Sequence, residues 1–298
     1  MAPHWKCGLG QPIAGSNPAL SANALADLAA PGCVVACAPR SRTLGALAPV
    51  LGSAFPGAAI SARAVASSDG MTDGFGPEIL PIEVADFRFP GDEAALRRGV
   101  VMVYAVRHRD GVLLFDTGFG FGNAELDEAY APRTLPIVEA LGAVGIGADE
   151  VTAVVNCHLH ADHAGQNAAF PGVPIFVQPA EWEIAHTTDH TILDWIDFPG
   201  GLYRQVAGDH DVADGIRIVA TPGHTPGHQS LVVETAGGPT VLAGQACYTV
   251  EEWMGAATEL EGRTSAPDEP AYNDSIRKLR ALRPGRVVFG HDRRDWTR

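Results

Sequence analysis

A cluster of metal-ligand side chains constrains this sequence most strongly. His158, His160, Asp162 and His163 fall within six residues, directly after the apolar run 151–156. Imidazole nitrogens and carboxylate oxygens are ligands that Zn²⁺ accepts. The first two histidines are two residues apart rather than four, so the pattern favours a loop at the end of a strand over one face of a helix. It predicts one ion beside His158 and His160, and a second beside Asp162 and His163.

A polar surface loop is the alternative interpretation of this cluster. We consider it weaker, because so many imidazoles are costly to group together without a cation.

Composition narrows the class of protein. The chain has 298 residues and is 46% hydrophobic, enough for a sizeable core in one large domain or two small ones. Its formal net charge of −14 argues against nucleic acid or an anionic membrane surface as a partner. No apolar run reaches the roughly 18 residues that a membrane span needs. The five cysteines form no convincing Cys-x-x-Cys pair, so we expect no disulfide framework and a cytoplasmic location.

The first 70 residues differ from the rest of the chain. They are rich in Ala, Gly, Pro and Ser, prolines interrupt every candidate helix, and the pattern is a poor match to a signal peptide. We expect residues 1–70 to be a disordered or non-native extension, with translation starting at Met71. Residues 71–298 are expected to form one folded domain.

The remainder of the chain mixes strands and helices in two successive halves, which favours a layered α/β fold. Strands are predicted at 79–87, 100–106, 112–115, 151–156, 173–178, 202–206, 216–220, 229–234, 240–243 and 287–289. Helices are predicted at 134–142, 179–186 and 272–282, with a short helix near Gln166 and an amphipathic segment at 191–198.

Further ligands are expected at the ends of three later strands. His224 closes the sequence Thr-Pro-Gly-His after strand 216–220, Gln245 follows Gly244 after strand 240–243, and His291 follows Gly290 after strand 287–289. Glycine beside each of these residues lets the backbone turn sharply towards a common centre.

With these motifs the chain resembles the metallo-β-lactamase superfamily, and the decapeptide Thr221–Ser230 resembles its N-acyl homoserine lactonase branch. The resemblance runs from about residue 78 to the C-terminus. It implies a four-layer αβ/βα sandwich, with two mixed sheets inside and the metal site at one rim. It also implies two sets of ligands. The first site would be His158, His160 and His224, and the second would be Asp162, His163 and His291.

Gln245 stands where this superfamily usually has an aspartate that bridges both metals. A carboxamide offers one neutral oxygen, together with an NH₂ group that repels a cation. The resemblance implies Zn²⁺ as cofactor, one or two per chain. Because residue 245 is Gln, the second site is expected to bind its ion more weakly. Cys247 could compensate as a thiolate, although an ordinary buried cysteine is the simpler interpretation.

The function that the resemblance implies is a metal-dependent hydrolase that opens a lactone ring, above all that of an N-acyl homoserine lactone, and so quenches quorum sensing. Asp162 would orient water or pass a proton to the leaving group. Tyr203 would donate a hydrogen bond to the oxyanion, although it could equally be a core aromatic. Asp116 and Asp292 are expected to hold ligand imidazoles by their outer nitrogen, and His228 to be structural.

Two alternatives stay open at this point. The chain could hydrolyse another ester, lactone or phosphodiester on the same fold. It could also be a non-catalytic binding protein with a degenerate second metal site. The expected partner is a small-molecule lactone or ester, and the sequence is compatible with a homodimer.

Overall fold

The computed structural model describes residues 76–88, 98–255 and 267–298. The predicted extension 1–70 and the proposed start at Met71 lie outside the described residues. The strands are β1 Glu78–Phe87, β2 Gly99–His108, β3 Gly111–Phe115, β4 Arg133–Thr134, β5 Val151–Val155, β6 Pro174–Val177, β7 Leu202–Gln205, β8 His210–Ala213, β9 Ile216–Ala220, β10 Gln229–Thr235, β11 Gly238–Leu242, β12 Arg286–Val288 and β13 Trp296–Thr297. The α-helices are α1 Ala124–Tyr130, α2 Ile137–Ala143, α3 Pro179–Thr187, α4 Leu193–Ile196, α5 Val250–Gly255 and α6 Glu269–Ala281.

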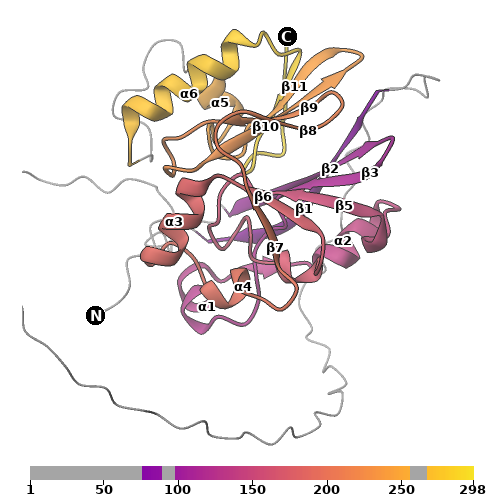
Figure 1. Ribbon diagram of the computed structural model, residues 1–298. Helices are drawn as coiled ribbons and strands as arrows, with labels where there is room; N and C mark the ends of the chain where they lie inside the picture. The colour runs from indigo at the N-terminus through magenta and orange to yellow at the C-terminus, as the bar shows by residue number, and fades with distance from the viewer. Residues whose placement is uncertain (1–75, 89–97, 256–266) are drawn as a thin grey trace, which may run out of the picture. The chain divides into compact units, whose positions relative to one another are not determined.

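Two mixed β-sheets form the centre of the fold, as Figure 1 shows. The first has seven strands in the order β4-β1-β2-β3-β5-β6-β7, and the second has six in the order β13-β12-β11-β10-β9-β8. The pairs β3–β5, β5–β6 and β6–β7 are parallel in the first sheet, and β11–β12 is parallel in the second.

Three apolar layers show how the sheets and helices stack. Strand β2 is buried on both faces, so its alternate residues serve different layers. Val101 and Val103 pack on the side of α1 to α4, whereas Val100 and Met102 pack between the two sheets. On the far side of the second sheet, α5 and α6 contribute a third cluster that includes Tyr272. The predicted four-layer αβ/βα sandwich is therefore confirmed.

Local sequence explains the places where the helices begin. Helix α6 begins earlier than predicted, at Glu269, because the Asp268 side chain accepts a hydrogen bond from Ala271 N and caps the first turn. The helix predicted from residue 134 begins instead at Ile137, because Thr134 pairs with Ala85 as strand β4. The short elements α1, α5, β8 and β13 escaped prediction, since they are too brief to show a period.

A strand of each sheet donates a backbone hydrogen bond to a loop that follows a strand of the other sheet. Met102 N in the first sheet donates to Gly290 O beyond β12, at 2.8 Å. Gln229 N in the second sheet donates to Cys157 O beyond β5, also at 2.8 Å. These bonds bring the loops that follow β5 and β12 to the same place. Among the described residues, no helix has the length and apolar character that crossing a membrane would require.

The loop after β5 also lies against the loop after β3, with almost no space between the two backbones. Gly165 N donates to Gly118 O at 3.0 Å, and Gly120 N donates to Ala161 O at 3.2 Å. A Cβ atom on Gly165 would lie 2.2 Å from Gly120 N and 2.3 Å from Ala161 O. Only glycine therefore fits at this position.

We predict that Gly165→Ala lowers the free energy of unfolding by about 1–3 kcal/mol, because two backbone segments must separate to admit the methyl group. Gly142→Ala is the matched control. Gly142 lies in helix α2, and outside its own helix backbone none of the described residues comes within 4 Å of the added Cβ, so alanine should raise the stability by up to about 1 kcal/mol. Urea unfolding of both variants measures the difference. Equal midpoints for the two variants would contradict the packing argument.

Candidate metal centre

Three imidazole nitrogens from two loops meet at the rim. His158 Nε2 lies 2.8 Å from His160 Nδ1, and His224 Nε2 lies 3.2 Å from each of them. Three ligands bound to one tetrahedral Zn²⁺ at 2.0–2.1 Å would lie about 3.3 Å apart. We call these residues the first triad. His224 comes from the loop after β9, so this triad joins both sheets.

A second group of similar size lies beside the first. His163 Nε2 is 3.3 Å from His291 Nε2, and Asp162 Oδ2 is 3.5 Å and 3.6 Å from these two nitrogens. We call these residues the second triad. His291 comes from the loop after β12. The structure thus brings together all six residues that the sequence placed in the two sites.

The outer nitrogen of several imidazoles has a hydrogen-bond partner that sets the ring orientation. His163 Nδ1 lies 2.9 Å from Asp116 Oδ2, and His291 Nδ1 donates to Val100 O at 2.7 Å. These bonds leave Nε2 of each ring to face the centre. The expectation for Asp116 is confirmed. Asp292 instead accepts from Val250 N and Arg294, so it orders the loop rather than an imidazole.

The electrostatic state of these side chains suits a divalent cation. Burial, followed by repulsion from neighbouring imidazoles, lowers the pKa of His158 and His224, and the pKa of His160 falls to about 3. These rings are therefore neutral and present lone pairs. Burial alone would raise the pKa of Asp162, but His163 and the other nearby imidazoles outweigh it, so the carboxyl group is ionised. Its Oδ2 is buried and has no hydrogen-bond partner among the described residues.

An unpartnered buried anionic oxygen and three converging neutral nitrogens are costly arrangements in the absence of a cation. The residues present therefore fit a metal of the zinc type.

Gln245 is buried beside the second triad. Its side chain contacts the His163 imidazole, and within the part of the chain that the structure describes its Oε1 has no hydrogen-bond partner. Its backbone N–H donates to His228 Nε2 at 3.0 Å, while His228 Nδ1 donates to Thr221 O at 3.1 Å. Burial lowers the pKa of His228 to about 4, so this histidine is a neutral structural residue that holds the Gln245 backbone.

Cys247 does not join either triad. Its sulfur contacts Thr249 O at 3.6 Å and the Glu252 carboxylate at 3.8 Å. Burial raises the pKa of this thiol well above its ordinary value. An ordinary buried cysteine describes it better than a compensating thiolate.

Glu181 binds both loops that carry the first triad, a role that no pattern in the sequence predicted. This carboxylate, fully buried in α3, accepts from Leu159 N at 2.8 Å and from Thr225 Oγ1 at 2.6 Å, and contacts His190 Nε2 at 2.6 Å. Leu159 and Thr225 are the chain neighbours of the triad histidines, so one carboxylate fixes both loops. A buried glutamate at a helix start gives no such signal in the sequence.

Tyr203 and Tyr248 occupy different surroundings. The Tyr203 hydroxyl accepts from Asn167 Nδ2 at 3.1 Å, and its ring packs against Trp182. Among the described residues its contacts include neither triad. Tyr248 has its hydroxyl 2.8 Å from His224 Nδ1, and its ring stacks on His291 at 5.8 Å. The structure therefore places Tyr248, three residues beyond Gln245, between a ligand of each triad.

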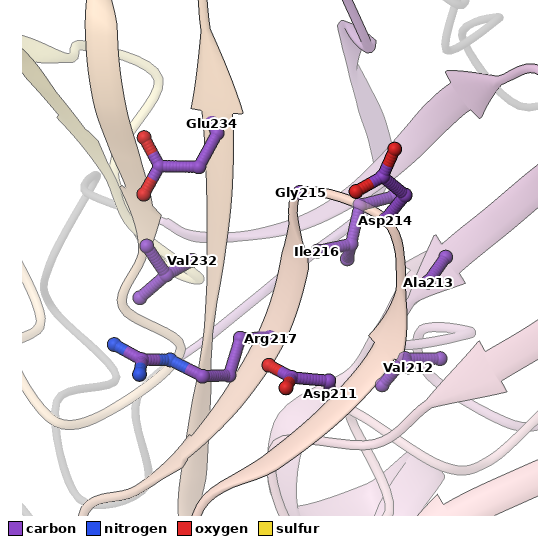
Figure 2. A pocket seen from close by; sticks show the side chains of 9 residues that line it. All are labelled: Asp211, Val212, Ala213, Asp214, Gly215, Ile216, Arg217, Val232 and Glu234. Atoms are coloured by element: carbon purple, nitrogen blue, oxygen red, sulfur yellow. The ribbon is translucent and has the colours of Figure 1, made fainter.

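A surface hollow of about 500 Å³ lies elsewhere, over strands β8, β9 and β10 (Figure 2). Charged side chains border it, including Asp211, Arg217 and Glu234. It contains no residue of either triad, so we do not assign the chemistry to it.

Comparison with known proteins gives a consistent result. The family model for the metallo-beta-lactamase superfamily matches residues 96–291. An N-acyl homoserine lactonase from a Bacillus species is 34% identical over 208 residues, which cover 64% of this chain and 81% of that protein. The N-acyl homoserine lactonase AiiA of Bacillus thuringiensis subsp. kurstaki is 32% identical over the same shares.

Solved structures agree with these relatives. An N-acyl homoserine lactone hydrolase with the product N-hexanoyl-L-homoserine at its catalytic metal centre superposes with a TM-score of 0.63 and 29% identity, over 74% of this chain and 95% of that chain. The dizinc quorum-quenching lactonase AidC, at 16% identity, has a TM-score of 0.56 over 73% of this chain and 88% of its own, and supports the fold alone.

Proposed function

This chain belongs to the metallo-beta-lactamase superfamily, in the family of the N-acyl homoserine lactonases, and we propose that it is a metal-dependent hydrolase that opens the ring of N-acyl homoserine lactones. The observation that carries the proposal is the pairing of 34% identity to a lactonase with two intact ligand triads at the rim. Opening the lactone of such a signal molecule would quench quorum sensing.

We assign Zn²⁺ to the two triads. His158, His160 and His224 would hold one ion, and Asp162, His163 and His291 would hold a second. Bound zinc brings the pKa of water near neutrality and polarises carbonyl oxygens, which is the chemistry that ester hydrolysis requires.

The protein's own side chains would bind the substrate and transfer the proton of the attacking water. Asp162 is ionised and buried within the second triad, so it can orient the attacking water, accept a proton from it and pass that proton to the leaving alkoxide. Tyr248 lies at the edge of both triads, where its hydroxyl can donate to the carbonyl oxygen as negative charge develops. Glu181 and Asp116 keep the ligand loops and rings in place, which limits reorganisation during the reaction.

The amide of Gln245 favours a weaker second metal. The first triad is built from three neutral imidazoles and does not depend on residue 245. The second triad has a single anionic ligand, Asp162, where a bridging aspartate would add another negative charge.

The proposal also covers the cellular location and the oligomeric state of the protein. A cytoplasmic location is supported by Cys157 and Cys247, which are thiols rather than disulfides. Light scattering would distinguish a monomer from the homodimer that the sequence allows.

The first prediction tests the activity. Adding N-hexanoyl-L-homoserine lactone to zinc-loaded protein should release one proton per ring opened, because the product is a carboxylic acid that ionises at neutral pH. A pH-stat measures this release, and His160→Ala provides the blank. No release above that blank, from protein shown by elemental analysis to hold zinc, would remove the lactonase assignment. Turnover of a chromogenic phosphodiester instead would favour the alternative hydrolase, and ligand binding without product would favour a binding protein.

The second prediction compares the two tyrosines. Tyr248→Phe should lower kcat about 100-fold, because the variant lacks the hydroxyl that faces the reacting carbonyl. Tyr203→Phe should lower kcat by less than about tenfold, because its hydroxyl contacts Asn167. Zinc content of both proteins, measured alongside kcat, controls for a damaged centre. A larger loss from Tyr203→Phe would restore the role expected from the sequence.

The third prediction concerns the second metal. Gln245→Asp should tighten zinc binding at the second triad by about tenfold or more, because a full negative charge near a dication is worth at least about 1.4 kcal/mol. Gln245→Asn has the shape of Asp without the charge and should give no gain. Zinc titration against a chromogenic chelator measures both variants. Equal affinities in the Asp and Asn variants would show that charge at residue 245 does not limit the second site.

A further inference from the structure

We propose that Cys157 is a positioning residue that connects the first triad to the carboxylate of Asp116, so that one buried acid orients a ligand of each metal. The inference rests on the metal centre of the proposed function and extends it to residues behind the ligands.

The topology places the two residues side by side. Strands β3 and β5 are parallel neighbours, with Phe115 opposite Val155, and the chain continues to Asp116 after one and to Cys157 after the other. Cys157 N donates to Asp116 Oδ1 at 2.7 Å, and Asp116 N donates to Val155 O at 2.9 Å.

Asp116 has a φ of 67°, in the left-handed region that residues other than glycine rarely adopt. Such a conformation persists only where its surroundings hold it. Here the side chain and the backbone of Asp116 are both fixed by hydrogen bonds to the neighbouring strand and loop.

The sulfur of Cys157 lies behind both triads. It is 3.1 Å from His158 Nδ1 and 3.3 Å from His163 Nδ1. The Nε2 atoms of these two rings face the first and the second triad respectively. One thiol therefore contacts the outer nitrogen of one ligand from each site.

The direction of each hydrogen bond follows from the tautomers. A ring that offers Nε2 to a metal carries its proton on Nδ1. His163 Nδ1 then donates to Asp116 Oδ2 at 2.9 Å, and His158 Nδ1 donates to the sulfur. Asp116 Oδ1 accepts from the Cys157 backbone N–H at 2.7 Å, which fixes the residue that carries the sulfur. Asp116 thus holds His163 directly and holds His158 through Cys157, whose backbone it binds and whose sulfur contacts the ring.

Space around the sulfur allows little movement. A Cβ atom on Gly244 would lie 2.7 Å from Cys157 Cβ and 3.1 Å from its sulfur. Gly244 has a φ of 59°, so its backbone approaches the cysteine as only glycine can. The thiol is confined between this backbone and the two rings, with its hydrogen-bonding directions fixed.

Metal affinity is the property to measure, because replacing a residue that hydrogen-bonds to a ligand imidazole usually lowers metal affinity 10- to 100-fold. Cys157→Ala should weaken Zn²⁺ binding at the first triad by about 10- to 100-fold in chelator competition. It should also shift the visible absorption bands of the Co²⁺-substituted protein. Cys157→Ser retains a donor and an acceptor and should restore both properties to near the wild-type values.

Cys247→Ala is the matched control. Cys247 is as fully buried as Cys157, but its sulfur contacts Thr249 O and Glu252 rather than an imidazole. This variant should lose stability with unchanged zinc affinity and an unchanged Co²⁺ spectrum. The double variant Cys157→Ala with Asp116→Asn should weaken the first site by less than the product of the single losses, because both act through one hydrogen-bonded chain.

Unchanged zinc affinity in Cys157→Ala would overturn the proposal. An equal loss in Cys157→Ala and Cys247→Ala, with no rescue by serine, would overturn it too, since that pattern marks a packing defect. Lactone turnover by the wild-type protein is measured separately. Failure of that assay would remove the proposed function, whereas failure of the metal measurements alone would remove only the role of Cys157.

Discussion

The burial of five imidazoles and one carboxylate at a single rim is the constraint on which the rest of this structure depends. The neutral imidazoles of the first triad, whose nitrogens lie 2.8–3.2 Å apart, cannot all find protein donors, and among the described residues Asp162 Oδ2 has no hydrogen-bond partner. A divalent cation resolves this cost, and because the arrangement forms only in the folded chain, metal binding adds to folding stability. The sandwich makes this arrangement possible, because the loops that carry the triad residues leave both sheets at the same rim and the two sheets hydrogen-bond to each other there.

Hydrogen-bonding groups outside the two triads hold the triad side chains and their loops in place. Asp116 orients His163, Val100 O orients His291, and Glu181 ties together the loops that carry the first triad. Val100 lies in β2, Glu181 lies in α3 and Asp116 directly follows β3, so the precision of the centre comes from the packing of the sandwich rather than from the loop itself. The close backbone contact at Gly165 likewise fixes the position of the loop that carries the ligands.

The two triads differ in charge, and that difference shapes the chemistry proposed for them. The first holds only neutral ligands, and the second has one carboxylate with the neutral amide of Gln245 beside it. Two cations side by side repel each other less when an anion lies between them. With a neutral amide at residue 245, Asp162 supplies the single negative charge among the triad side chains, which is the reason for proposing a weaker second site.

The sequence by itself determined the long strands and the layered fold, because hydrophobic periodicity is a local property. Its histidine cluster and strand-end residues predicted the six triad residues together with the resemblance to the superfamily. Short elements such as α1 and β8 could not be predicted from it, and the role expected for Tyr203 rested on the resemblance to the lactonase branch. Only the tertiary structure decided that Tyr248 lies between the triads, that Glu181 braces two loops and that Cys157 contacts His158 and His163 together. These contacts join residues from separate elements, and no local pattern encodes which side chains the packing of two sheets will bring within hydrogen-bonding distance.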